Sequence, residues 1–320
     1  MNRDSLIYVS GHSGLLGSAV VQKLGERGYR NLLLCPHIRE CNPIASLELL
    51  DWDAVNTFFY RTKPEYVFHC AAKIGGIMAT SKYQADFLWE NLMINAHVIK
   101  GAQINGVKRM IVPGSVCTFP KDCPVPIKEE YALTGAFEPT CEGYAIAKMS
   151  SLFMVKYFNE LYGTNFLTTN LCNLYGDNDC WDSSRNHVIP ALIEKFHNAK
   201  RNNLTAVTLM GTGIAEREFM HADDAADVLV RLMECPVVSQ YAGGVVNIGG
   251  GESVNIRELA KIISEVIGYE GEILFDGDDT KDGALKRRLD TTMFRQVIDW
   301  SPKIALKDGI IRMYQHYSNR

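Results

Sequence analysis

The sequence lacks any long run of apolar residues. Its first apolar stretch, Leu6–Val9, is too short for the core of a secretory signal or for a helix that spans a bilayer. Nine cysteines are scattered without a paired framework, and no Cys-x-x-Cys spacing followed by histidines suggests a zinc site. We therefore expect a reduced, cytoplasmic protein with no membrane association and no bound metal.

Positive charge is not in excess either. The 320 residues carry a formal net charge of −4, which argues against broad nucleic-acid binding but permits a local basic pocket. Hydrophobic residues make up 47% and charged residues 22% of the chain, ordinary values for a folded soluble protein. A chain of this length can form one large core and a smaller second lobe.

Short β-branched or aromatic runs alternate with amphipathic stretches of helical length in the first half of the chain. This alternation is typical of an α/β fold with a parallel sheet. Strands are predicted near residues 6–10, 31–35, 66–70, 109–112 and 166–171, and helices near 14–28, 53–62, 83–105 and 144–162. The sequence thus predicts a Rossmann-type, doubly wound parallel sheet.

The regular alternation loosens after residue 172, where loops rich in Asn, Asp and Gly interrupt shorter elements. We expect residues 1–172 to form the dinucleotide-binding domain and roughly residues 214–248 to return to it. Residues 173–213 and 249–320 are then expected to form a smaller, substrate-binding α/β lobe. Val207–Met210 and Val245–Ile248 are candidate strands that return to the main sheet.

A glycine motif lies directly between the first predicted strand and the first predicted helix. Its spacing is Gly-x-x-Gly-x-x-Gly, a pattern that allows a tight turn and lets backbone amides approach a pyrophosphate at the helix N-terminus. A purely structural turn is the alternative, but the position after the first strand favours dinucleotide binding. The candidate cofactor-binding residues here are Gly11, Ser13, Gly14, Leu15, Leu16 and Gly17.

The end of the second predicted strand bears on which dinucleotide is bound. NAD-specific sites usually place an acid there to bind the ribose hydroxyls. This chain has no acid until Glu40, and His37 or Arg39 could instead meet a 2′-phosphate. The sequence therefore favours NADPH, with a solvated loop charge as the alternative for Arg39.

Tyr144 and Lys148 form a Tyr-x-x-x-Lys pair on a predicted helix, where side chains four residues apart share a face. A lysine cation beside a phenol, helped by an oxidised nicotinamide ring, favours the phenolate and lowers its pKa from the ordinary value of about 10. Tyr144 is then a candidate to protonate a ketone oxygen, and Ser115, near the end of the fourth strand, to bind the same oxygen. A surface Tyr/Lys pair is the alternative, but the ordered set of glycine loop, serine and Tyr-x-x-x-Lys is far more specific.

Together these motifs resemble the extended short-chain dehydrogenase/reductases and, within them, the GDP-L-fucose synthase family, almost from end to end. Further matching stretches are residues 71–77, 114–117, 138–140, 173–176, 186–192 and 217–221. The resemblance implies a 3,5-epimerase and NADPH-dependent 4-reductase that converts GDP-4-keto-6-deoxymannose to GDP-L-fucose. It also implies cofactor contacts by Ala71, Lys148 and His187, and a homodimer formed through the two long helices.

By the same resemblance, Cys117 is the base and His187 the acid of epimerisation, although the sequence does not exclude the reverse. A ketone at C4 acidifies the C3 and C5 protons, and a thiol and an imidazole, with ordinary pKa values of about 8.5 and 6.5, exchange protons near neutrality. A lone cysteine or histidine is more often structural. Their joint occurrence in two matching motifs favours catalysis, and the absence of the Asp-Glu pair typical of sugar dehydratases argues against dehydration.

The later lobe is expected to bind the nucleotide-sugar. By resemblance, Arg217 contacts the diphosphate, for which a guanidinium is geometrically suited. Lys195 and Arg287 are further candidates, with a solvated charged face as the alternative for residues 286–288. Asn173 and Met210 are candidates to line the sugar site.

Departures from the family pattern leave the exact sugar open. Ser13 stands where several bacterial relatives carry an arginine suited to the 2′-phosphate, and Met210 stands where relatives often have Trp. One competing hypothesis is a sister enzyme with the same catalytic residues, acting on another GDP-4-keto-sugar such as a colitose or 6-deoxyheptose precursor. Another is a non-catalytic NADPH-binding sensor, against which the base–acid pair argues.

Overall fold

The computed structural model describes residues 1–35, 47–235 and 244–319. His37 and Arg39, the candidates for the 2′-phosphate, lie outside the described residues. Within the described ranges, no helix combines the length and the apolar character that crossing a membrane requires.

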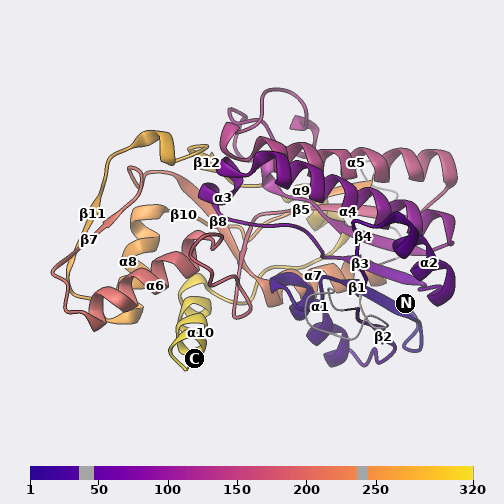
Figure 1. Ribbon diagram of the computed structural model, residues 1–320, viewed down its shortest axis with the longest axis horizontal. Helices are drawn as coiled ribbons and strands as arrows, with labels where there is room; N and C mark the ends of the chain where they lie inside the picture. Colours follow the sequence, from indigo (N-terminus) through magenta and orange to yellow (C-terminus); the bar gives the residue numbers. More distant parts are fainter. Residues whose placement is uncertain (36–46, 236–243, 320) are drawn as a thin grey trace.

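A six-stranded parallel sheet forms the larger part of the molecule (Figure 1). The strand order is β2-β1-β3-β4-β5-β9, and each neighbouring pair runs parallel. The strands are β1 Ile7–Ser10, β2 Leu32–Leu33, β3 Tyr66–His69, β4 Arg109–Pro113, β5 Phe166–Leu171 and β9 Val245–Ile248. The predicted α/β fold with a parallel central sheet is confirmed.

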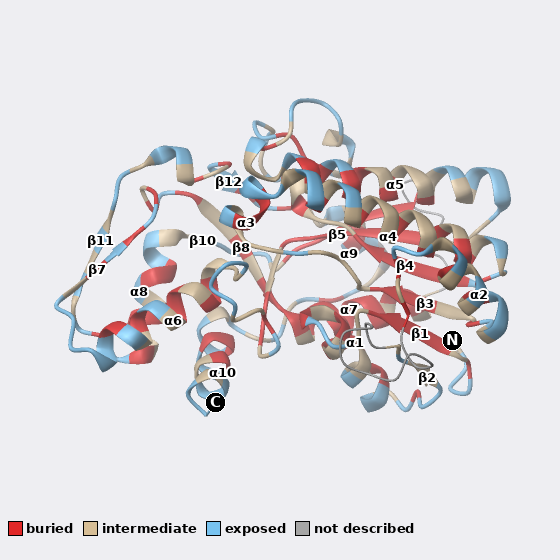
Figure 2. Ribbon diagram, in the orientation of Figure 1, coloured by how far each residue is buried: buried red, intermediate tan, exposed pale blue. Residues whose placement is uncertain are grey.

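Helices cover both faces of this sheet, and Figure 2 shows its strands largely buried between them. One layer contains α1 Leu15–Glu26, α7 Ala222–Glu234 and α9 Thr292–Val297, and the other contains α2 Trp52–Thr62, α4 Gln84–Ile104 and α5 Glu142–Tyr162. Alternate residues of β1 serve the two layers, since Ile7 and Val9 pack with α1 and α7 whereas Tyr8 packs with α2 and α4. Burial on both faces explains why β1, β3 and β4 are mainly apolar and do not alternate with polar residues.

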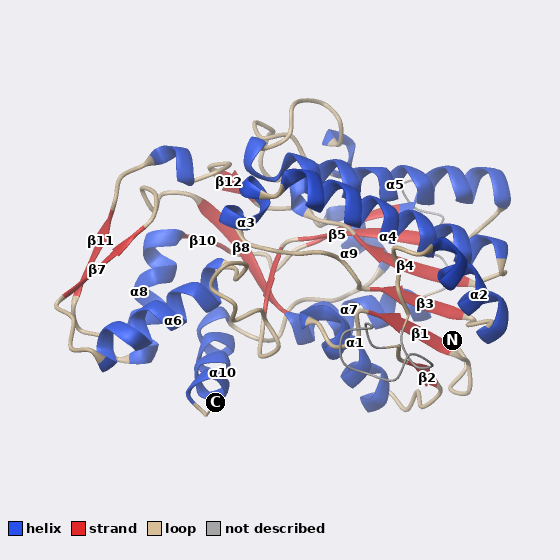
Figure 3. Ribbon diagram, in the orientation of Figure 1, coloured by secondary structure: helices blue, strands red, loops and turns tan. Residues whose placement is uncertain are grey.

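The smaller part is built from elements that follow β5 (Figure 3). A second sheet is centred on β8, and β7 pairs separately with β11 in parallel. These strands are β6 Asn173–Tyr175, β7 Ala206–Leu209, β8 Glu216–His221, β10 Ser253–Asn255, β11 Glu272–Phe275 and β12 Lys286–Arg287. Helices α6 Val188–Arg201, α8 Ile256–Ile267 and α10 Leu306–Ser318 pack around their own apolar cluster.

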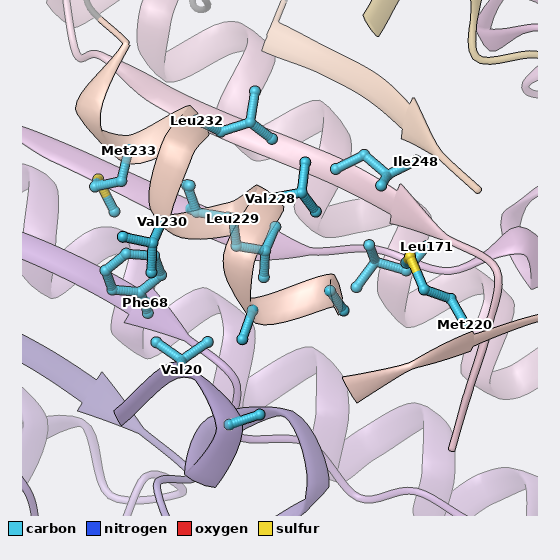
Figure 4. Packing of buried hydrophobic residues seen from close by; sticks show 14 of the residues in the cluster. Val20, Phe68, Leu171, Met220, Val228, Leu229, Val230, Leu232, Met233 and Ile248 are labelled. Carbon is cyan, nitrogen blue, oxygen red and sulfur yellow. The ribbon is translucent and has the colours of Figure 1, made fainter. Parts of the chain in front are cut away.

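Helix α7 connects the second sheet back to the main one. Its apolar residues Val228 and Leu232, four positions apart, share one face of the helix. Figure 4 shows them beside Leu171 of β5 and Ile248 of β9, in the same buried cluster. The end of β8 is thereby held against the carboxyl end of the main sheet, where the site residues gather.

Two strand predictions differ from the structure. The strand predicted at Val207–Met210 forms as β7, but it pairs with β11 outside the main sheet, whereas Val245–Ile248 does join the main sheet as β9. The strand predicted near Asn31–Cys35 is only the two-residue edge strand β2. An apolar run specifies burial without specifying a neighbour, which explains the first difference.

A further helix and the place of β8 were not anticipated by the sequence pattern. Helix α3 Ile77–Lys82 follows the loop after β3 and has no counterpart among the predicted helices. Of residues 214–248, expected to return to the first domain, α7 and β9 pack with the main sheet, but β8 lies in the second sheet. The chain thus passes between the two sheets within this segment.

Candidate active site

The glycine loop leaves the carboxyl end of β1 and enters α1. The strand order reverses between β1 and β3, the kind of position at which open α/β sheets bind ligands. A Cβ at Gly17 would lie 2.1 Å from the carbonyl oxygen of Gly11, so only glycine lets α1 begin this close to the loop. Gly14 caps α1 without a side-chain hydrogen bond, which leaves the first amides of the helix for an anion. The loop therefore fits a dinucleotide pyrophosphate.

The other predicted residues of the loop have distinct environments. Ser13 is exposed, Leu15 is buried in the main apolar cluster, and Leu16 packs against that cluster. The backbone amides of the two leucines, rather than their side chains, are therefore the groups suited to a phosphate. Ala71, after β3, donates its amide to Ser10 Oγ at 3.2 Å and so lies beside the same loop.

A buried polar network lies beneath the loop. Ser10 Oγ is 2.8 Å from His69 Nδ1, and His69 Nε2 is 3.1 Å from Asn95 Oδ1. Burial, with a smaller effect of the Lys148 charge, lowers the pKa of His69 to about 3, so the ring is neutral. This network joins the ends of β1 and β3, and sequence reasoning did not find it.

Ser115 and Cys117 lie just beyond the end of β4. Ser115 caps the short helix η1 Val116–Thr118, and its Oγ accepts from the Cys117 amide at 3.2 Å. The Cys117 side chain also shares a hydrogen bond with Cys141, which ends the short helix η3 Pro139–Cys141. The two sulfurs are thus brought together from segments on either side of a long connection.

The surroundings of Cys117 favour its thiolate. The hydrogen bond with Cys141 has the largest effect and lowers the pKa of Cys117, whereas burial raises it. Ser115 and the guanidinium groups of Arg287 and Arg217 lower it further. Together these groups lower the pKa of Cys117 to about 6. Cys117 is therefore ionised at neutral pH, the state that a general base requires.

Tyr144 and Lys148 lie in the first turns of α5. The Tyr144 side chain shares a hydrogen bond with Ser115. Burial, followed by the neighbouring Cys117 and Cys141, nevertheless raises the pKa of Tyr144. Lys148 is buried, its Nζ donates to the carbonyl oxygen of Pro113 at 2.8 Å, and burial lowers its pKa to about 8.

The lowered pKa expected for Tyr144 is therefore wrong for this structure. Lys148 does lie near the phenol, with Nζ 5.9 Å from the ring centroid, but its ammonium binds a backbone carbonyl. Burial of the phenol and the charges of Cys117 and Cys141 raise the pKa of Tyr144, and the hydrogen bond with Ser115 opposes them. Tyr144 is consequently a protonated phenol at neutral pH, which is the form that can donate a proton.

His187 caps the N-terminus of α6, and its Nδ1 lies 3.2 Å from Oδ1 of the buried Asp179. Burial alone would lower the pKa of His187, but the hydrogen bond and charge of Asp179, together with the Cys117 charge, raise it. A Cβ at Gly76 would lie 2.3 Å from the carbonyl oxygen of Asn186, so glycine lets this segment approach the loop after β3. His187 thus lies within electrostatic reach of Cys117, with surroundings that favour its protonated form.

Two arginines reach the same cluster from the second sheet. Arg217 of β8 and Arg287 of β12 are partners in the parallel strand pair. Arg217 Nη2 donates to the Asp282 carbonyl and Arg287 Nη1 to the Pro120 carbonyl, each at 2.8 Å. Arg287 is buried, so the solvated-face alternative does not hold for this residue.

Three other candidate substrate-binding residues make their contacts outside this cluster. Asn173 Nδ2 donates to the Glu218 carbonyl at 3.0 Å, and Lys195 Nζ donates to the Thr208 carbonyl at 2.6 Å. Met210, just beyond β7, is 48% exposed. The hydrogen bonds of the first two go to backbone carbonyls of the second lobe and not to Cys117 or His187. Across residues 1–35, 47–235 and 244–319, no group of three potential metal ligands is present.

Sequence reasoning missed Cys141 and Asp179. Cys141 had a usable signal, because it directly follows the matching stretch 138–140 and lies three positions before Tyr144. Asp179 lies in an irregular loop whose sequence does not indicate that its carboxylate is buried beside His187. These two residues set the ionisation of the proposed base and acid.

Comparison with known proteins places this geometry in a family. The model of the NAD dependent epimerase/dehydratase family matches residues 7–249. GDP-L-fucose synthase 1 of Arabidopsis thaliana is 41% identical over 317 residues, covering 99% of this chain and 94% of the plant protein. The GDP-L-fucose synthase of Escherichia coli strain K12 is 36% identical, covering 97% of this chain and 96% of the bacterial protein.

A solved structure agrees along nearly the whole chain. It is the GDP-mannoheptose C4 reductase from Campylobacter jejuni with NADP bound, which is 36% identical and covers 99% of both chains with a TM-score of 0.87. The resemblance drawn from the motifs is confirmed. The chain is therefore an enzyme of the NAD dependent epimerase/dehydratase family and belongs, within it, with the GDP-L-fucose synthases and their close relatives.

Proposed function

We propose that the chain is a bifunctional 3,5-epimerase and NADPH-dependent 4-reductase that converts GDP-4-keto-6-deoxymannose to GDP-L-fucose. The observation that carries the proposal is that Cys117, whose pKa is lowered toward the thiolate, and His187, whose pKa is raised by Asp179 and by the Cys117 charge, lie within electrostatic reach of each other near Ser115 and Tyr144. A plain reductase needs only the hydroxyl side of this site. A non-catalytic sensor needs neither side.

The glycine loop and Ala71 are proposed to hold NADPH. The close contact of Gly17 with Gly11 and the uncapped start of α1 are the features that suit the pyrophosphate. Lys148 and His187 are assigned to the nicotinamide end, and His37 and Arg39 to the 2′-phosphate. When bound, NADPH supplies the hydride that reduces C4.

Epimerisation is assigned to Cys117 and His187. The C4 ketone makes the C3 and C5 protons acidic, so the Cys117 thiolate can remove each in turn and leave an enolate on the sugar. The imidazolium of His187, oriented by Asp179, then returns a proton from the opposite face. Hydroxyl donors of Ser115 and Tyr144 are placed to stabilise the enolate oxygen.

Reduction uses the phenol of Tyr144. Because its pKa is raised, Tyr144 holds its proton at neutral pH and can transfer it to the C4 oxygen as that oxygen becomes an alkoxide. Ser115 binds the same oxygen. Lys148, fixed to the Pro113 carbonyl, keeps a positive charge near the phenol and stabilises the negative charge left on Tyr144.

The substrate lobe is proposed to consist of residues 173–221 and 249–320 without α9, and the first domain of residues 1–172 together with α7, β9 and α9. Arg217 and Arg287 stand beside Cys117, so they are assigned to the diphosphate-sugar end of the GDP-sugar. Asn173, Lys195 and Met210 are assigned to more distant parts of the substrate.

A sister enzyme that acts on another GDP-4-keto-sugar is the second candidate. It is favoured by the similarity to a heptose C4 reductase, at 36% identity over 99% of both chains, and by the half-exposed Met210. Both candidates use the same reactive groups. They differ in the sugar that fits between those groups and the second sheet.

We further propose a cytoplasmic homodimer that pairs through α4 and α5. The outer faces of these helices carry exposed apolar side chains, namely Trp89, Ile146, Tyr157, Leu161 and Tyr162. A reducing compartment suits the free thiols at residues 117 and 141. Light scattering of the purified protein at several concentrations would report a monomer if this dimer proposal is wrong.

The deciding experiment is incubation with NADPH and GDP-4-keto-6-deoxymannose in heavy water. The proposed function predicts NADPH oxidation and solvent deuterium at both C3 and C5 of the product. NADPH oxidation without deuterium would identify a plain 4-reductase and contradict the roles of Cys117 and His187. The same incubation with GDP-linked 4-keto-heptose or 4-keto-3,6-dideoxy sugars compares the two candidate functions by kcat/KM.

A further inference from the structure

The last helix, α10, packs against the loop that carries the proposed acid. This loop, residues 176–187, runs from the end of β6 to the start of α6 and contains Asp179 and His187; we call it the acid loop. Helices α10 and α6 contribute to one apolar cluster in the smaller part of the molecule (Figure 1). Neither proposed reaction uses a residue of α10, so its contacts with the acid loop indicate a separate role.

A glycine lets α10 approach the start of the acid loop closely. A Cβ at Gly309 would lie 2.3 Å from the hydroxyl oxygen of Tyr175, the last residue of β6. Tyr175 is buried, and its ring meets that of His221 edge to face at 5.3 Å. Because Tyr175 is packed in place, a larger residue at position 309 would push α10 away from β6 and the acid loop.

Arg312 joins the acid loop to the start of α7. Its Nη2 lies 3.2 Å from Oδ2 of Asp177 and 2.9 Å from Oδ2 of Asp223. All three side chains are partly exposed, so these ion pairs contribute modestly and weaken as salt is added. The contact fixes the loop two residues before Asp179.

Tyr317 holds the loop on the other side of Asp179. Its ring stacks on the ring of Trp181, with centroids 4.7 Å apart and planes inclined by 29°. The same ring meets His197 of α6 edge to face at 5.2 Å, so it also contacts the helix that His187 caps. Aromatic stacking is less sensitive to salt than an exposed ion pair, so this contact is the more robust of the two.

We propose that α10 is a positioning element for the acid of epimerisation: Arg312 and Tyr317 hold the acid loop so that its carboxylate, Asp179, stays against the imidazole. The inference rests on the proposed function, because it requires His187 to be the acid. Asp179 Oδ1 lies 3.2 Å from His187 Nδ1. A loop held on both sides of this carboxylate keeps that contact, whereas a loose loop would let water replace it.

The groups around His187 make this role testable without substrate. Asp179, from the acid loop, and Cys117, from η1, are the ionisable groups that act on the imidazole, and both raise its pKa against the effect of burial. Neither belongs to α10. A substitution in α10 can therefore change the titration of His187 only by changing where the acid loop or α6 lies.

The first measurement titrates the imidazole itself. NMR follows the His187 ring in the full chain without substrate, and His187→Asn identifies its signal. Tyr317→Ala should lower the midpoint by about 0.5 pH units, because Asp179 then contacts the ring for less of the time, and adding Arg312→Ala should lower it by about 1 pH unit. Tyr317→Phe keeps the stacked ring and should titrate like the natural protein.

Two substitutions elsewhere on α10 are the matched controls. Tyr314→Ala removes another ring that contacts His197, at 5.9 Å, and Lys307→Ala removes an exposed ion pair with Glu265. Both leave the contacts with the acid loop in place, so the His187 midpoint should not move.

A double-mutant cycle isolates the stack. The effects of Trp181→Ala and Tyr317→Ala on the midpoint should not add, because both break the same contact. Additive effects would overturn the role given to the stack.

Deuterium exchange then connects the loop to the reaction. At pH 7.5 and saturating substrate, Arg312→Ala/Tyr317→Ala should lose roughly three- to fivefold in C3 and C5 exchange and recover near pH 6, while the KM for the GDP-sugar and NADPH binding stay within about twofold. An unchanged His187 midpoint in this variant, with near-ultraviolet circular dichroism like that of the natural protein, would overturn the inference. A lowered midpoint with no exchange in the natural protein would instead contradict the proposed function, so the two failures are distinguishable.

Discussion

The two sides of the proposed site differ in how the protein treats their ionisable groups. On the side of Cys117 and His187, neighbouring charges and hydrogen bonds favour the charged forms, a thiolate and an imidazolium. On the side of Tyr144 and Lys148, burial dominates and both pKa values move toward the neutral forms. Proton abstraction and return need a base and an acid that are already ionised, whereas reduction needs a phenol that still holds its proton.

This contrast follows from where each pair lies. Cys117 lies in the short helix η1 and His187 at the N-terminus of α6. Cys141, Arg217, Arg287 and Asp179 reach them there. Tyr144 and Lys148 lie on a long helix packed against the main sheet, and their nearest polar partners are Ser115 and a backbone carbonyl. Substitutions on one side should therefore affect one reaction and spare the other.

Tyr144→Phe should abolish most of the reduction and spare epimerisation. Losing the proton donor is expected to slow hydride transfer by about 10³-fold, within the usual range for general acid catalysis. Deuterium exchange at C3 and C5, measured by mass spectrometry of recovered GDP-sugar, should stay within a few-fold. Unchanged NADPH oxidation would refute the proton-donor role.

Cys117→Ser should have the opposite effect. A serine hydroxyl does not ionise near neutral pH, so exchange at C3 and C5 should fall by about 10²-fold or more. NADPH binding, followed by fluorescence titration, should be retained, as in the control Cys123→Ala. Weak NADPH binding in Cys117→Ser alone would indicate that this thiol is mainly structural.

The natural enzyme should show a bell-shaped pH profile of exchange. The rate should fall as pH drops through the Cys117 pKa of about 6, because the base is protonated, and fall again as pH rises through the raised pKa of His187, because the acid is lost. Between pH 7 and pH 5 the expected loss is roughly tenfold, one factor of ten for each pH unit below the pKa. An exchange rate that stays level from pH 7 to pH 5 would contradict the thiolate assignment.

Asp179→Asn should produce the smallest change. Without the carboxylate charge the pKa of His187 falls, so the alkaline limb of the exchange profile should move to lower pH. We expect a several-fold loss at pH 7.5 and near-normal exchange close to pH 6. Asp182→Asn, at an exposed carboxylate in the same loop, is the control. Identical profiles for the two variants would exclude the proposed role of Asp179.

Much of the main sheet was predictable, because the apolar residues of its strands are also the residues that the fold buries. The strand that contains Ile7 and Val9 is short, apolar and followed by glycine, and it forms β1 as expected. Residues 207–210 form a similar short apolar run, yet they pair with β11 outside the main sheet. An apolar run predicts burial but not which strand will be its neighbour. Helix α3 escaped prediction because its six residues are too few to show a clear helical periodicity.

Within the site, the sequence predicted which side chains are reactive but not which of them are ionised. Ser115, Cys117 and Tyr144 stand in recognisable motifs, and the structure brings their side chains together. The expected direction for the Tyr144 pKa was wrong, because burial of the phenol cannot be read from its spacing to Lys148. Partners such as Cys141 and Asp179 become visible only when distant segments meet.

The amino-acid sequence alone determined the kind of fold, the glycine loop and the residue types available for proton transfer, because periodicity, turn chemistry and motif spacing are local properties of the chain. Only the tertiary structure decided which strand each apolar run pairs with, and which of those residues are charged. Pairing and ionisation both depend on groups far apart in the chain, since a neighbour's charge and the exclusion of water act through space.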